Sequence, residues 1–278
     1  MTGTAKARAV APPQRVDFVD EGVAVPGNAV PILASIRDPR SAVGEELRLL
    51  RANLQAIRHK RQRTSPLSCI AVVSALPGEG KSTVSLGLAA AMAREPGRRI
   101  LLIEGDLRRP ALTSGLGLEP RPGLGEWLQG ALEEVPVRRV DPGGFYLLSA
   151  GNVTLERPEE LGSSRMDAIL RAARDRFEAV ILDATPILPV ADVVLLQDLV
   201  DGFLLVVRSR MTPRAAILDA LGRIREDKVV GIVLNDQREY RRSYMSYAYD
   251  RYSMYSGSAE GSPRPSGREG RRARDEDR

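Results

Sequence analysis

The chain has 278 residues, of which 43% are apolar and 28% are charged, and its mean hydropathy is −0.20. This apolar content excludes wholesale disorder and is enough for one large α/β domain with tails or for two small domains. The most apolar stretch, residues 187–207, is interrupted by Asp192, Asp198 and Asp201, which excludes a membrane-spanning helix there. A single cysteine, Cys69, excludes an internal disulfide. No apolar signal-peptide region follows the amino terminus, so we expect a cytosolic protein.

The net charge is +5 and the isoelectric point is about 9.6. Basic residues attract phosphates and nucleic acids when they cluster on one surface. Here they are mostly arginines spread along the whole chain. This distribution indicates a general bias in amino-acid composition rather than a basic binding surface. We therefore expect no nucleic-acid partner.

The first 60 residues of the chain divide into an irregular segment and a helix. Residues 1–40 have no helical or strand periodicity and are predicted to form a flexible arm. From residue 42 to about residue 60, apolar side chains recur at helical spacing and predict an amphipathic helix. They are Leu47, Leu50, Leu54 and Ile57.

Short apolar runs then alternate with longer amphipathic segments. The predicted strands are 69–75, 99–105, 145–151, 179–185, 202–208 and 229–235. The predicted helices are 81–94, 157–176, 190–199 and 213–226. Nearly continuous Val, Ile and Leu in the strands indicates burial on both faces, as in a mostly parallel, doubly wound α/β sheet under two layers of helices.

A phosphate-binding loop is predicted directly after the first buried strand, where ALPGEGKST (75–83) leads into a helix. Gly78 and Gly80 allow backbone N–H groups to converge on a β-phosphate, and the helix adds its positive end. Lys81 is expected to bridge the β- and γ-phosphates, and the Ser82 hydroxyl to ligate Mg²⁺. Ala75 stands where the general pattern has its first glycine. The expected nucleotide contacts are Pro77, Gly78, Glu79, Gly80, Lys81, Ser82 and Thr83.

Carboxylates follow two later strands. Glu104 and Asp106 come at the end of the strand predicted at 99–105, and Asp183 ends the strand predicted at 179–185. Because ligands bind beyond the carboxyl ends of the strands in such sheets, these groups are expected near Lys81. Carboxylates there hold Mg²⁺ or its water shell in P-loop proteins. The residues thus predict a site for ATP and Mg²⁺ and leave open a phosphotransferase or an ATP-driven switch.

Tyrosines are concentrated after the last predicted strand. The chain has seven tyrosines, and six of them fall between residues 240 and 255. Uniform scattering would place fewer than one there. The six are Tyr240, Tyr244, Tyr247, Tyr249, Tyr252 and Tyr255.

With these motifs, residues 42 to about 255 resemble the bacterial tyrosine kinases, the capsule and exopolysaccharide autokinases of the CpsD/CapB type. ALPGEGKST matches the family's Walker A loop, LLIEGDLRRP its Walker A′ motif and VILDATPILPVAD its Walker B strand. Each motif also occurs in the wider MinD/ParA group of ATPases, whose P-loop NTPase fold the resemblance implies. The tyrosine tail and a helix carrying Glu45, Arg48 and Arg51, which fits the family's Glu-x-x-Arg-x-x-Arg ring-forming pattern, separate the kinases from that group.

The resemblance implies a role for each matched residue. Lys81 stabilises the transferring phosphoryl group, Ser82 and Asp106 serve Mg²⁺, and Asp183 supports the metal shell. Glu104 takes the position of the group that activates the incoming tyrosine hydroxyl, although the family normally carries aspartate there. Asn235, at the end of the last strand, joins the nucleotide contacts, and the six clustered tyrosines become the phosphoacceptors.

The resemblance also implies an organisation and a set of partners. The chain divides into a flexible arm (1–40), a P-loop kinase domain (41–237), the tyrosine cluster (238–255) and a disordered tail (256–278). Phosphorylation in trans requires a homo-oligomer, expected to be a ring. A separate membrane-spanning chain-length regulator would activate the kinase, and a phosphotyrosine phosphatase would reverse its action. The expected location is cytoplasmic, peripheral to the inner membrane through the activator.

Two alternative functions remain open from the sequence. One is a MinD/ParA-type ATPase switch; such a protein is expected to carry a second lysine early in the P-loop, and none precedes Lys81 in residues 74–80. The other is a degenerate kinase that binds ATP and acts by assembly only. Glu104 leaves this alternative possible because it replaces the aspartate that the family normally carries at that position. For the helix, an intrahelical ion pair between Glu45 and Arg48 is the alternative to an interface.

Overall fold

The structure is a computed structural model that describes residues 11–13, 15–25, 30–61, 67–152 and 158–236. The chain divides into two units, Met1–Asp236 and Gln237–Arg278, and all described residues belong to the first. The predicted tyrosine cluster and C-terminal tail therefore lie outside the described residues.

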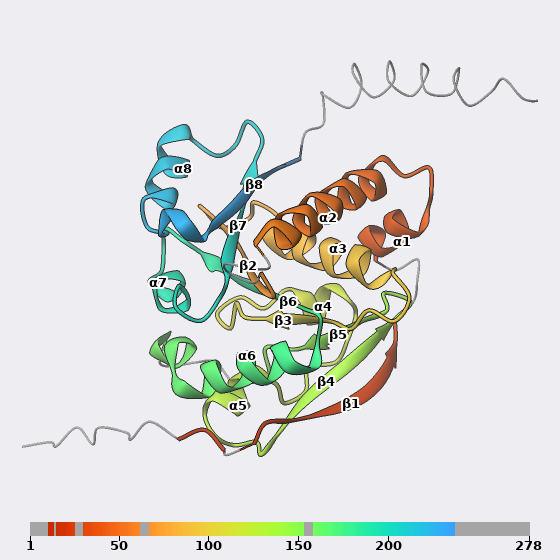
Figure 1. Cartoon of the computed structure of the whole chain (residues 1–278), viewed down its shortest axis with the longest axis vertical. Helices are drawn as coiled ribbons and strands as arrows, with labels where there is room; N and C mark the ends of the chain where they lie inside the picture. Colours follow the sequence, from red (N-terminus) through yellow and green to blue (C-terminus); the bar gives the residue numbers. More distant parts are fainter. Residues whose placement is uncertain (1–10, 14, 26–29, 62–66, 153–157, 237–278) are drawn as a thin grey trace, which may run out of the picture. The chain divides into compact units, whose positions relative to one another are not determined.

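A single sheet forms the centre of the first unit, with the strand order β1-β4-β5-β3-β6-β2-β7-β8 (Figure 1). Neighbouring strands are parallel except for the antiparallel pair β4 and β5. The mostly parallel sheet and the six predicted strands are confirmed, and β2 and β3 are buried along their whole length as expected. The strands are β1 (Asp17–Ala24), β2 (Cys69–Ser74), β3 (Ile100–Glu104), β4 (Glu134–Asp141), β5 (Phe145–Leu148), β6 (Ala179–Pro186), β7 (Gly202–Arg208) and β8 (Val229–Asn235).

Helices cover both faces of the sheet (Figure 1). One face carries α1 (Pro31–Arg37), α2 (Ala42–Arg61) and α3 (Lys81–Ala93). The other carries α5 (Leu124–Leu128), α6 (Ser164–Arg176), α7 (Asp192–Leu196) and α8 (Arg214–Leu221). The short helix α4 (Leu112–Gly115) follows β3, and 3-10 turns form at Pro158–Gly162 and Glu226–Lys228. Within the described ranges, no helix combines the length and the apolar character needed to cross a membrane.

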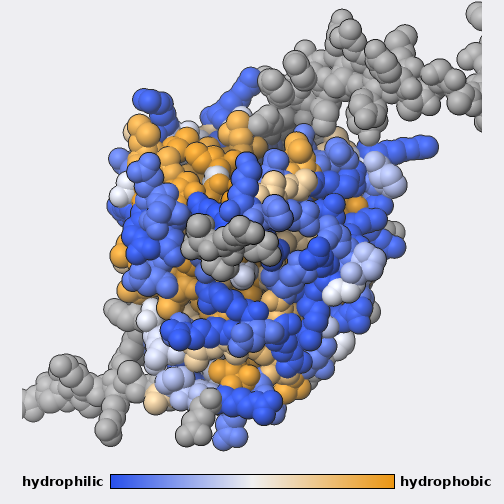
Figure 2. Space-filling view, in the orientation of Figure 1, coloured by the Kyte–Doolittle hydropathy of each residue, from blue (hydrophilic) through white to orange (hydrophobic). Residues whose placement is uncertain are grey.

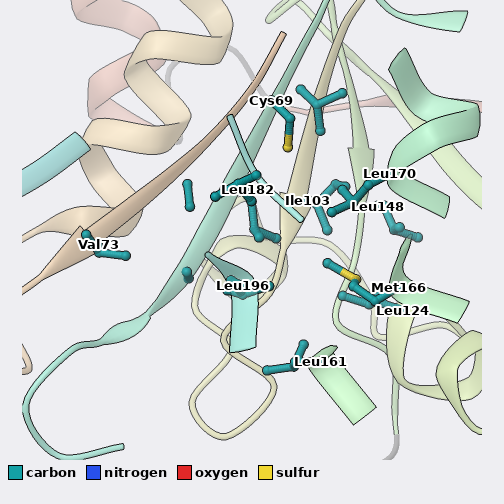
Figure 3. Packing of buried hydrophobic residues seen from close by; sticks show 14 of the residues in the cluster. Cys69, Val73, Ile103, Leu124, Leu148, Leu161, Met166, Leu170, Leu182 and Leu196 are labelled. Atoms are coloured by element: carbon teal, nitrogen blue, oxygen red, sulfur yellow. The ribbon is translucent and has the colours of Figure 1, made fainter. Parts of the chain in front are cut away.

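The sheet separates two apolar cores, as the two helix layers require. The core under α6 includes Leu148, Met166 and Leu170 (Figure 3). Cys69 belongs to this core, and its complete burial raises the pKa of the thiol to about 12. The core on the opposite face packs α3 against the sheet and includes Leu88. Both faces of the central strands are therefore sealed, and only the strand ends are free to form a site.

The prediction of a flexible arm over residues 1–40 is wrong for residues 17–24 and 31–37. The first range is β1, which runs parallel to β4 with Asp17 opposite Glu134. The second is α1, which packs on α2 and α3 and buries Leu33 and Ile36. The sequence DFVDEGVA of β1 mixes charges with apolar residues because an edge strand keeps part of its surface in water.

Strand β8 forms the other edge of the sheet, and part of its outer surface is apolar. Ile232 and Leu234 of β8 are 52% and 51% exposed, and Leu218 of α8 is 51% exposed. Figure 2 shows apolar surface gathered over α8 and β8. Helices therefore cover this edge less completely than they cover the centre of the sheet.

Candidate functional site

The predicted phosphate loop connects β2 to α3, which confirms the strand–loop–helix context. Gly78 and Gly80 have φ angles of +81° and +91°, in the left-handed region that favours glycine. The Glu79 carboxylate folds back and accepts the Leu76 N–H at 2.9 Å. Helix α3 begins at Lys81, so its first N–H groups face the space beyond the loop. This arrangement forms an anion-binding site.

Asn235 holds the outer side of the loop. Its Nδ2 donates to the Glu79 carbonyl at 2.9 Å. A Cβ atom on Gly80 would lie 2.1 Å from the same nitrogen, so residue 80 must be glycine for this contact to exist. The predicted nucleotide contact Asn235 is thus placed against the loop itself.

We expect Gly80→Ala to weaken nucleotide binding by about 10-fold or more, because positive φ costs an L-residue about 1 kcal/mol and the clash with Asn235 adds to it. Isothermal titration with Mg·ADP measures the change. The matched control is Gly97→Ala, which also has a positive φ of +79° but meets no atom within 4 Å. Equal affinities of the two variants would contradict the importance of the Asn235 contact.

Lys81 brings two of the predicted carboxylates together. Its Nζ lies 2.9 Å from Asp106 Oδ2 and 3.8 Å from Asp183 Oδ1. Asp106 follows β3 and Asp183 lies in β6, so the two strands that carry them are neighbours in the sheet. All three side chains are largely buried, which strengthens their mutual attraction.

Asp183 is the most perturbed acid of the site. Burial raises the pKa of Asp183 to about 6, although Lys81, Ser82 and Ser85 favour the charged form and lower it. The Ser85 hydroxyl donates to Asp183 Oδ1 at 3.2 Å. The other oxygen, Oδ2, is buried and has no hydrogen-bond partner within the described part of the chain. An orphaned carboxylate oxygen at this point is suited to a cation or its water shell.

The same residues fit a magnesium ion. No group of three His, Cys, Asp or Glu side chains in the described ranges is arranged to hold a metal ion by itself. Mg²⁺ does not need such a cage, because it is usually bound by one or two carboxylates together with substrate phosphates. Asp106, Asp183 and the Ser82 hydroxyl, 3.5 Å from Lys81 Nζ, supply that incomplete set of ligands.

Glu104 is engaged elsewhere. It is fully buried; Oε1 accepts the N–H groups of Leu112 at 2.6 Å and Thr113 at 3.1 Å. Oε2 accepts the Thr113 hydroxyl at 2.5 Å and the Ala150 N–H at 3.1 Å. A carboxylate has about four lone-pair sites, so these donors saturate it. The predicted role of Glu104 toward a tyrosine hydroxyl stays a prediction, and these contacts argue against it.

The predicted oligomerisation residues make intramolecular contacts. Arg48 pairs with Glu45 at 2.7 Å, which is the intrahelical ion pair considered as the alternative. Arg51 donates to the Ala91 carbonyl at 3.3 Å and lies 3.5 Å from Glu95. Arg51 therefore helps to fasten α2 to α3. An interface role for this helix stays a prediction.

One cation of the site was missed in the sequence. Arg208, the last residue of β7, donates to the Gly78 carbonyl at 3.3 Å. Thr212, in the turn that follows, hydrogen-bonds the Glu79 carboxylate. A charged residue at the carboxyl end of a buried strand was the signal used for Asp183, and the same criterion would have identified Arg208.

Known proteins resemble the chain over most of its length. The CobQ/CobB/MinD/ParA nucleotide binding domain family matches residues 70–249. Tyrosine-protein kinase YwqD of Bacillus subtilis is 31% identical over 217 residues, which are 77% of this chain and 89% of YwqD. Succinoglycan biosynthesis transport protein ExoP of Rhizobium meliloti is 34% identical over 203 residues, 71% of this chain but 25% of ExoP. The BceF tyrosine kinase domain superposes with a TM-score of 0.63 and 31% identity, over 73% of this chain and 81% of that domain.

These matches agree with the geometry of the site. The nucleotide-binding family accounts for the loop between β2 and α3, and two of the three similar proteins are named tyrosine kinases. The P-loop fold is thereby established together with the class of enzyme. The chain belongs to the bacterial tyrosine kinases, within the CobQ/CobB/MinD/ParA group of nucleotide-binding domains.

Proposed function

We propose that the chain is an ATP- and Mg²⁺-dependent autokinase that phosphorylates the tyrosine cluster of another copy of itself. The observation that carries this proposal is the convergence of Lys81 with Asp106 and Asp183 beside a phosphate loop. That combination provides a triphosphate with a cation, metal ligands and converging N–H groups.

The chain's own groups divide the work on the donor side. The loop and the first turn of α3 bind the β-phosphate through backbone N–H groups. Lys81 holds the terminal phosphates by charge, and Asp106 and Asp183 keep its ammonium group in place. Ser82, Asp106 and Asp183 would hold Mg²⁺, which would supply further neutralisation of the phosphate oxygens.

The acceptor side requires positioning more than a strong base. Phosphoryl transfer passes through a largely dissociative transition state, in which positioning and charge neutralisation account for most of the catalysis. A tyrosine hydroxyl is then competent without a dedicated carboxylate at Glu104, whose four acceptor sites are occupied. This argument supports an active kinase over a degenerate one.

The cellular setting is inferred from a relative. ExoP is named a succinoglycan biosynthesis transport protein, which supports a role of this chain in capsule or exopolysaccharide biosynthesis and export. We place the kinase at the cytoplasmic side of the inner membrane, with a separate membrane-spanning chain-length regulator as activator and a phosphotyrosine phosphatase as antagonist. Assembly into a ring would use the α2 residues Glu45, Arg48 and Arg51.

Mapping of phosphotyrosine tests the activity. The purified chain is incubated with Mg·ATP and its phosphorylation sites are located by mass spectrometry, beside a variant with all six clustered tyrosines changed to phenylalanine. We expect label only within 240–255 and none in the variant. Tyr146, half-buried in β5 and packed on Phe177, is the internal control that stays unlabelled. ATP hydrolysis without phosphotyrosine would instead support the ATPase switch, and ATP binding with neither reaction the degenerate kinase.

A mixing experiment tests transfer between chains. Lys81→Met keeps its tyrosines and lacks the catalytic lysine, while the phenylalanine variant keeps the lysine and lacks the acceptors. Neither should label alone, and together they should label the Lys81→Met chain. If the mixture stays unlabelled while the wild type labels itself, transfer is intramolecular and the trans reaction is excluded.

A further inference from the structure

The phosphate loop is held from outside by the ends of two strands. Arg208 at the end of β7 donates from Nη1 to the Gly78 carbonyl at 3.3 Å. Asn235 at the end of β8 donates to the Glu79 carbonyl at 2.9 Å. Two successive carbonyl groups of the loop are therefore each bound by a side chain.

These contacts orient the N–H groups of the same peptide planes. In a trans peptide the C=O and the N–H point in opposite directions. A Gly78 carbonyl that is bound on the outer side therefore directs the Glu79 N–H to the inner side, and the Glu79 carbonyl does the same for the Gly80 N–H. Because glycine adopts positive and negative φ with similar ease, peptides beside Gly78 and Gly80 need such external contacts to stay in one orientation.

Arg208 is itself oriented by the residue that follows β8. Its Nε and Nη2 donate to Asp236 Oδ2 at 3.0 and 2.9 Å. Asp236 is the last described residue and has a φ angle of +59°, in the left-handed region that aspartate tolerates better than most residues. The arginine thus joins the loop to the point at which the chain continues toward the tyrosine cluster.

We infer that Arg208 is a positioning residue for the phosphate loop and that Asp236 sets its orientation, so that the start of the C-terminal segment influences phosphate affinity. The inference rests on the proposed nucleotide site and adds a connection between that site and the acceptor segment. Neither Arg208 nor Asp236 is among the residues predicted to contact nucleotide. Their effect is exerted through the Gly78 carbonyl.

Nucleotide titrations test this inference. Mg·ADP and AMP are titrated against the wild type, Arg208→Met, Asp236→Asn and the double variant. The hydrogen bond from Arg208 to the Gly78 carbonyl is charge-assisted, so we expect Arg208→Met to weaken ADP binding about 10-fold. Asp236→Asn leaves that bond in place and only loosens the arginine, so we expect a weaker effect of about 3-fold. The ADP affinity of the double variant should equal that of Arg208→Met, because Asp236 acts on the loop only through Arg208. AMP, which lacks the β-phosphate, should lose much less than ADP.

Two controls separate positioning from folding. Arg225→Met and Asp198→Asn remove a comparable ion pair of 3.0 Å whose residues lie outside the loop and its contacts, and they should leave ADP affinity unchanged. Arg208→Lys keeps the charge and should recover part of the affinity. The inference would be overturned if Arg208→Met left ADP affinity unchanged. It would also be overturned if the losses of ADP affinity in the two single variants added up in the double variant, or if ADP and AMP lost affinity equally. A wild-type chain that fails to bind ADP would overturn the proposed nucleotide site itself.

Discussion

Replacement of Lys81 by methionine is expected to lower the yield of phosphotyrosine at least about 1,000-fold, the scale of losing a principal cation in phosphoryl transfer. Methionine keeps the length of the side chain and removes its charge. Asp106 and Asp183, which lie 2.9 and 3.8 Å from the ammonium group, would then face the phosphates without a cation between them. Quantitative mass spectrometry of the 240–255 segment, in initial-rate conditions, measures the loss.

The control for this substitution is Lys60→Met. Lys60 is an exposed residue in the last turn of α2, so the same chemical change there should leave both the rate and the affinity unaltered. Circular dichroism is used first to establish that the Lys81→Met variant is folded, and its kinase rate is measured afterwards. A folded Lys81→Met chain that retains more than a tenth of the wild-type rate would refute the role assigned to this lysine.

Replacement of Glu104 by alanine is expected to destabilise the fold by about 3–5 kcal/mol, because four buried donors would lose their acceptor. For a domain of this size the midpoint of thermal unfolding should fall by roughly 10 °C. The unfolding midpoint of Glu104→Gln should fall by a smaller amount. The glutamine carbonyl oxygen can still accept hydrogen bonds, whereas its NH₂ group would face the other donors and cannot accept from them. Calorimetry or circular dichroism measures both shifts.

The activity of Glu104→Gln distinguishes a structural carboxylate from a catalytic base. If Glu104 ties β3 to α4 and the segment after β5, the variant should be less stable yet keep most of its kinase rate at temperatures at which it is folded. A catalytic base would give the opposite result, an unchanged unfolding midpoint with a rate lower by about 100-fold or more. Glu133→Gln, an exposed glutamate before β4, is the control for both measurements.

Local patterns explain which parts of the fold were predictable. The strands buried on both faces, such as β2 and β3, are continuous apolar runs, and their position follows from composition alone. Strands β1 and β4 were missed because each lies toward the edge and mixes charged with apolar residues. Their parallel pairing joins residues more than 100 positions apart, and no local period reports such a partner.

The site shows the same division between local and long-range information. The sequence by itself determined the phosphate loop, since glycines at 78 and 80 and the lysine at 81 require only the strand before them and the helix after them. It also placed Asp106 and Asp183 at strand ends that a parallel sheet brings to one edge.

Only the tertiary structure decided which way the remaining side chains turn. Glu104 ends β3 and pairs with Asp183 of β6, yet Thr113 and Ala150 donate hydrogen bonds to Glu104 whereas Asp183 lies beside Lys81. Arg208 reaches the loop because β7 pairs with β2. The physical reason is that a buried polar group takes whatever partner the packed neighbours present, and those neighbours come from distant parts of the chain.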